Sequence, residues 1–139
     1  IGSEKGSKKF YYVSEKAKSE LNVPYWHDQL GSFDKDHITR MMGEEMRPYI
    51  VEEDVECLPL QDVLDRNRVN TIDLLHIDTE GFDYKVLSQL DLKRYKPSVI
   101  LFEHHLLPND EFDKARKLLR GNSYRLVQYG NDILAIRRR

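Results

Sequence analysis

The chain has 139 residues, of which 40% are hydrophobic and 33% are charged, and this balance is typical of one soluble globular domain with a single core. Its formal net charge of -2 gives no basic field that would attract nucleic acid or an anionic membrane, and no apolar run approaches the roughly 18 residues of a spanning helix. A single cysteine, Cys57, excludes an intrachain disulfide and a thiolate metal cluster, and it agrees with a reducing, cytoplasmic location.

The first 54 residues show little regular periodicity. KKFYYV, residues 8–13, is predicted to form a strand, and the remainder is predicted to be mostly loop with one or two short helices. An aromatic cluster around Trp26 is followed by Ser32. These residues could line a substrate pocket, or the aromatic rings could plug the open edge of a sheet.

From residue 55 to residue 139, short apolar runs alternate with amphipathic stretches, which predicts an α/β fold. Thr79 is predicted to cap one of the helices. The order resembles the second half of a doubly wound sheet that ends in an antiparallel hairpin. The predicted elements are a strand at 55–58, a helix after Pro59, a strand at 72–77, a helix at 82–90, a strand at 98–103, a helix that ends near Gly121, and strands at 124–129 and 132–137 around a Gly130-Asn131 turn.

The best-defined strand, at 72–77, has apolar residues on both faces, as expected of a parallel strand that helices cover on either side. It is followed by an acidic loop in which Asp78, Glu80 and Asp83 surround Gly81. In open α/β sheets, ligands bind beyond the carboxyl ends of the parallel strands, so Asp78 is a candidate catalytic residue. Asp83 is better explained as a favourable charge at the start of the next helix, and Glu80 fits either role. Gly81 permits a tight turn or a close approach of the backbone to a ligand.

A second strand ends on a carboxylate at Glu103, which is followed by His104 and His105. A histidine at this place could act as a general base near neutral pH. Because neighbours on an extended chain face opposite ways, Glu103 and His105 are predicted to share one side and His104 to face away. His76, inside the 72–77 strand, is predicted to be a half-buried structural histidine.

The acids and the histidine at these two strand ends also have the donor types that suit a hard divalent ion. The sequence contains no dedicated ligand spacing such as HExxH, so we predict no metal site. A metal-assisted hydrolase remains an alternative function. Its candidate ligands are Asp78, Glu80, Glu103 and His105.

Two stretches resemble the FkbM-type family of S-adenosylmethionine-dependent methyltransferases: IDLLHIDTEGFDYKVLSQLD at 72–91 and PSVILFEHHLL at 97–107. The family shows an I-D-x-E-G-x-[DE] signature, which is IDTEGFD at 77–83 in this chain, and then a strand that runs from a proline to a glutamate, here Pro97 to Glu103. The resemblance covers nearly the whole chain.

The resemblance implies a Rossmann-like class I methyltransferase sheet and methyl transfer from S-adenosylmethionine to a hydroxyl of a small molecule or glycan. It would place Asp78 close to the sulfonium of the cofactor and to the acceptor hydroxyl. The predicted roles are catalytic for Asp78, Glu80 and His105, cofactor-binding for Asp78 and Gly81, and substrate-binding for Trp26, Ser32, Glu103 and His104.

In such methyltransferases, a glycine-rich loop after the first strand holds much of the cofactor, and this chain has no such motif. We therefore expect residues 1–139 to be the C-terminal two-thirds of one methyltransferase domain, which alone binds the cofactor weakly or not at all and is inactive. The strand at 72–77 would then form an edge of the sheet, which a second copy could cover in a homodimer. A noncatalytic interaction module is a further alternative.

Overall fold

The computed structural model describes residues 1–138, which form two compact units. One unit is Gly6–Cys57, here called the hairpin unit, and the other combines residues 1–5 with residues 58–138 and is called the sheet unit. Each unit has its own hydrophobic cluster. The boundary after Cys57 lies close to the change in periodicity that the sequence shows at residue 55.

The hairpin unit is built on two antiparallel strands, β1 (Gly6–Val13) and β2 (Ile50–Cys57), which pair along their full length. The segment between them packs short helices against one end of this ribbon, around a core of apolar side chains that includes Ile38 and Met46. Those helices are α1 (Lys16–Glu20), η1 (His27–Gln29), α2 (His37–Met42) and η2 (Glu44–Tyr49).

Strand β2 begins at Ile50, and the predicted start at residue 55 is therefore wrong. The run of acids inside β2 concealed the strand, because it has no apolar alternation over those residues. A two-stranded ribbon has exposed surfaces that accept such charges. Lys9 of β1 lies between two of them, with its Nζ 3.0 Å from Glu52 Oε1 and 2.9 Å from Asp54 Oδ2.

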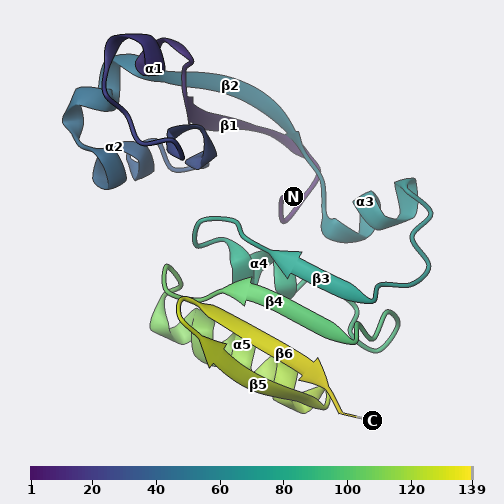
Figure 1. The fold of residues 1–139 in the computed structure, drawn as a ribbon. Coiled ribbons are helices and arrows are strands. Elements are labelled where there is room, and N and C mark those ends of the chain that lie inside the picture. Colours follow the sequence, from purple (N-terminus) through teal and green to yellow (C-terminus); the bar gives the residue numbers. More distant parts are fainter. Residues whose placement is uncertain (139) are drawn as a thin grey trace. The chain divides into compact units, whose positions relative to one another are not determined.

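The sheet unit contains a four-stranded sheet in the order β3-β4-β6-β5 (Figure 1). Strands β3 and β4 are parallel, and β6 is antiparallel to both β4 and β5. The order of strands and helices from residue 55 onward agrees with the prediction. The elements are α3 (Leu60–Arg66), β3 (Leu74–Ile77), α4 (Asp83–Leu87), β4 (Val99–Glu103), α5 (Asn109–Gly121), β5 (Tyr124–Tyr129) and β6 (Asp132–Arg137).

The closing hairpin of β5 and β6 is confirmed, with Tyr129 paired to Asp132 across the Gly130-Asn131 turn. Gly130 has a φ of 58°, a left-handed conformation that glycine adopts without steric cost and that suits a two-residue hairpin turn. Since the turn residues and the alternation of the strands point to the same register, this part of the fold was readable from the sequence.

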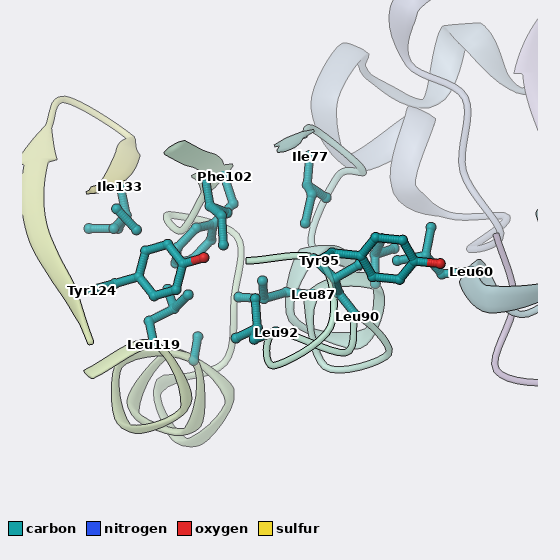
Figure 2. Packing of buried hydrophobic residues seen from close by; sticks show 14 of the residues in the cluster. Leu60, Ile77, Leu87, Leu90, Leu92, Tyr95, Phe102, Leu119, Tyr124 and Ile133 are labelled. Atoms are coloured by element: carbon teal, nitrogen blue, oxygen red, sulfur yellow. The ribbon is translucent and has the colours of Figure 1, made fainter. Parts of the chain in front are cut away.

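The core of the sheet unit lies between the sheet and helices α4 and α5 (Figure 2). Phe102 of β4, Leu87 of α4 and Leu119 of α5 are all fully buried. Alternate residues of each strand enter this core, as the period of two along a strand requires. Among residues 1–138, no helix has the length and apolar character needed to cross a membrane.

The other residues of β3 do not enter this core. Leu74 is 59% exposed, and His76 is exposed as well. The predictions of a strand covered on both faces and of a half-buried His76 are therefore wrong, because α4 and α5 pack on the face to which Leu75 and Ile77 contribute.

Tyr124 offers a direct test of this core. Its hydroxyl donates a 2.7 Å hydrogen bond to the carbonyl oxygen of Pro97, and both residues are buried. Tyr124→Phe is expected to lower the free energy of unfolding by about 1–3 kcal/mol, because it leaves a buried acceptor without its donor. Denaturant unfolding measures this loss. Tyr129→Phe, at a residue that is 82% exposed, is the control, and equal effects of the two variants would contradict the assignment.

Candidate active site

The carboxyl ends of β3 and β4 bring acidic residues together. The last pair in the parallel register is Ile77 with Phe102, so the next residues, Asp78 and Glu103, lie at the same edge of the sheet. Burial raises the pKa of the Glu103 carboxyl, and the negative charges of Asp78 and Glu80 raise it further. These three acids therefore form one electrostatic cluster.

His105 belongs to the same cluster. Its Nδ1 lies 3.2 Å from Glu103 Oε1, and the interaction with His105 partly offsets the rise in the Glu103 pKa. His104 instead stacks on Phe112 of α5, with ring centroids 4.8 Å apart and an interplanar angle of 20°. The predicted separation of the two histidines is confirmed, and it leaves His105 as the imidazole beside the acids.

The turn between β3 and α4 holds an unusual backbone conformation. Glu80 and Gly81 have φ values of 51° and 89°, a left-handed region that is costly for a residue with a side chain. A Cβ on Gly81 would lie 3.2 Å from the carbonyl oxygen of Leu106. The glycine therefore permits both the turn and the close approach of the loop that follows β4.

Gly81→Ala is expected to destabilise the sheet unit by about 1–3 kcal/mol, because alanine is strained at this φ and its methyl group meets the Leu106 backbone. Gly121→Ala is the matched control, since a Cβ there meets no atom within 4 Å, and it is expected to be neutral or slightly stabilising. Thermal unfolding of the two variants compares them. A Gly81→Ala variant as stable as the parent would refute the proposed requirement for glycine.

Asp83 is completely buried, which the sequence did not reveal. Its Oδ2 accepts a hydrogen bond from Thr79 Oγ1 at 3.1 Å, and its Oδ1 accepts one from the backbone N–H of Glu103 at 3.2 Å. The prediction that Thr79 caps the helix is wrong, because the N-cap of α4 is Phe82, which makes no side-chain capping bond. The Thr79 hydroxyl instead donates its hydrogen bond to the Asp83 carboxylate.

A favourable charge at the start of α4 does not explain why Asp83 is completely buried. Such a charge contributes about 0.3–1 kcal/mol at an exposed site, whereas removing an ionised carboxylate from water costs several kcal/mol in real proteins. Burial accordingly raises the pKa of Asp83, although the hydrogen bond from Thr79 and the one from the Glu103 backbone lower it in part. The only sequence signal for this role is the final acid of IDTEGFD.

Trp26 and Ser32 lie in the hairpin unit. Trp26 is half-buried and packs against that unit's core. Ser32 exchanges two backbone hydrogen bonds with Tyr11 of β1, at 2.8 and 2.9 Å, and its Oγ accepts one from the Asp34 N–H at 3.1 Å. Both residues therefore have structural contacts within this unit, and their roles in substrate binding remain predictions.

The metal-assisted alternative gains no support from this geometry. Over residues 1–138, no group of three or more His, Cys, Asp or Glu side chains is arranged so that it could hold a metal ion. The acids at the strand ends, Asp78, Glu80 and Glu103, are better understood as a negatively charged cluster beside the imidazole of His105. This cluster is called the acidic mouth below.

A mixed α/β protein with an acidic mouth at the ends of two parallel strands fits a methyltransferase, and the comparison with known families agrees. The family model described as "Methyltransferase FkbM domain" matches residues 5–126. The chain belongs to the FkbM methyltransferase family. Comparisons with curated proteins and with solved structures gave no match.

Proposed function

We propose that the protein transfers a methyl group from S-adenosylmethionine to a hydroxyl of a small molecule or glycan. The observation that carries the proposal is the meeting of Asp78, Glu80 and Glu103 at the carboxyl ends of β3 and β4, in a chain of a methyltransferase family. Ligands of open α/β sheets bind at this edge.

The topology of the sheet unit supports the same proposal. The order β3-β4-β6-β5, with a parallel pair and a terminal antiparallel hairpin, is what we expect of the C-terminal portion of a Rossmann-like class I methyltransferase sheet. In that arrangement the acidic mouth faces the crevice in which donor and acceptor would meet.

The charges suit this donor. When bound, S-adenosylmethionine supplies an electrophilic methyl group on a positively charged sulfonium. The carboxylates of Asp78 and Glu80, which already act on Glu103 electrostatically, provide a negative environment for a cation at this place. Gly81, in the same turn, is the further candidate for a contact with the cofactor, through its backbone.

Asp78 is the residue that would act on the acceptor. It is exposed directly after β3, where its carboxylate can accept the proton of the acceptor hydroxyl as the oxygen attacks the methyl carbon. The donor would supply the methyl carbon, and its sulfur would keep the electron pair of the carbon–sulfur bond, as a neutral thioether, while the carbon–oxygen bond forms. Glu80 supports the charge of the site.

Glu103 and His105 would bind the acceptor and take part in moving its proton. Burial raises the pKa of Glu103, so this carboxyl keeps a proton to higher pH than an exposed glutamate does. Its partner His105 has a ring nitrogen that can pass a proton between Glu103 and an acceptor. His104, which also follows β4, is a further candidate for a contact with the acceptor.

The test is methyl transfer from isotope-labelled S-adenosylmethionine to a panel of hydroxyl-bearing glycans and small molecules, with the protein expressed from its natural coding sequence. We expect label in an acceptor, and equal transfer when a chelator is present. Cleavage of a substrate that needs a divalent ion and proceeds without the methyl donor would instead favour the hydrolase alternative.

A further inference from the structure

The buried carboxylate of Asp83 connects two segments that carry the acidic mouth. Thr79, whose hydroxyl donates to Oδ2, lies in the turn after β3, and Glu103, whose backbone N–H donates to Oδ1, lies at the end of β4. Within residues 1–138, no other Asp or Glu side chain is buried to the same degree.

The hydrogen bonds of Asp83 lie just beyond the last paired residues of β3 and β4. The parallel pairing of β3 and β4 ends at Ile77 and Phe102. Beyond that pair the two segments would be free to separate, and the Asp83 carboxylate links them instead. Its bond to the Glu103 N–H also fixes the direction in which the backbone of Glu103 leaves the sheet.

We propose that Asp83 is a positioning residue of the methyl-transfer site, which holds the turn that carries Asp78 and Glu80 at a set distance from Glu103. The inference rests on the proposed function for its catalytic consequence. Asp83 should also affect the position of His105, because Glu103 Oε1 lies 3.2 Å from His105 Nδ1.

If Asp83 only placed a negative charge at the start of α4, its carboxylate would not need to be buried between Thr79 and Glu103. Asp110 in the first turn of α5 shows the ordinary case: it is exposed and lies 2.7 Å from the Lys114 ammonium. Asp83 is buried, and its carboxylate is directed to a hydroxyl and to a backbone N–H of a different strand. Burial raises its pKa, which agrees with a carboxyl that has exchanged water for these two donors.

The experiment compares three variants of the naturally expressed protein. Asp83→Leu keeps the number and branching of the side-chain heavy atoms, with methyl groups that are larger than the carboxylate oxygens, and it accepts no hydrogen bond. Asp83→Asn keeps an acceptor for the Glu103 N–H and offers its amide N–H to the Thr79 oxygen. Asp110→Asn is the matched control for the loss of an acid in the first turn of a helix.

The first readout is the rate of methyl transfer. Asp83→Leu is expected to lower kcat about 10- to 100-fold with little change in KM for the donor, as removal of a residue that orients a catalytic group does. Asp83→Asn should restore kcat to within about threefold, because it keeps the hydrogen-bonding pattern. A reduction in Asp110→Asn as large as in Asp83→Leu would overturn the proposal.

The second readout needs no catalysis. NMR follows the amide of Glu103 and the titration of the His105 ring; both should change in Asp83→Leu and remain close to the parent in Asp83→Asn. An unchanged His105 titration in a folded Asp83→Leu variant would overturn the proposal. If that variant does not fold, Thr79→Val decides by the same NMR criterion, because Thr79 is exposed and the substitution removes its hydroxyl donor to Asp83 Oδ2.

The two readouts separate two failures. If the parent transfers no methyl group to any acceptor but the NMR changes occur as expected, the proposed function fails and the positioning of Glu103 by Asp83 stands. If the parent is active and neither readout responds to Asp83→Leu, the positioning role fails and the proposed function stands.

Discussion

Asp78→Asn is expected to lower the turnover number for methyl transfer by about 100- to 10,000-fold, the usual contribution of a positioned general base. The amide keeps the shape of the side chain but neither accepts the proton nor carries the negative charge beside the sulfonium. Since most of the donor lies away from this carboxylate in the proposed arrangement, its binding should change far less than turnover.

Single-turnover kinetics together with calorimetric titration of the donor measure the two effects separately. Asp73→Asn is the matched control, because Asp73 is an exposed acid just before β3, at the opposite end of the strand from Asp78. It should have parent-like turnover. Unchanged turnover in Asp78→Asn would remove this carboxylate from the mechanism.

Phe102→Ala is expected to destabilise the sheet unit by about 3–5 kcal/mol, the range for a fully buried aromatic side chain. Phe102 is 0% exposed and lies in the core between the sheet and helices α4 and α5 (Figure 2). It also precedes Glu103 directly, so a cavity at this position should disturb the acidic mouth as well as the core.

Hydrogen exchange of the amides in β4 and β6 reports this loss locally. Val127→Ala is the control, on β5, which pairs with β6, at a residue that is 41% exposed. It should cost about 1 kcal/mol or less, because the valine buries little apolar area. Equal protection of the β4 amides in Phe102→Ala and in the parent would contradict the central place of this ring in the core.

Much of the sheet unit could be predicted because local signals agreed with one another. The closing hairpin had alternation in both strands and glycine in a two-residue turn, and helix α5 had an apolar stripe that includes Ala115 and Leu119, both buried. Where turn chemistry and periodicity point to the same element, sequence is informative about structure.

The meeting of Glu103 and His105 was also predictable, because alternation along an extended segment decides which neighbours share a side. The cluster of Asp78, Glu80 and Glu103 followed from the rule that parallel strands end at one edge. Both arguments need only local geometry and the assumption of a parallel pair.

Other features depend on contacts that local patterns do not contain. Strand β2 was missed in part because its acids pair with Lys9 of β1, and the exposure of His76 depends on which face the helices cover. The role of Asp83 could not be predicted because its partner, the Glu103 N–H, lies 20 residues away along the chain.

The central claim is that the acidic mouth supports transfer of a methyl group to a hydroxyl. The most direct measurement is NMR of the product after reaction with S-adenosylmethionine carrying a ¹³C-methyl group. The account predicts a new ¹³C signal at the chemical shift of a methyl ether, which Asp78→Asn should form about 100- to 10,000-fold more slowly than the parent. A ¹³C-methyl signal on nitrogen or carbon, or an equal methyl ether signal from the variant, would contradict it.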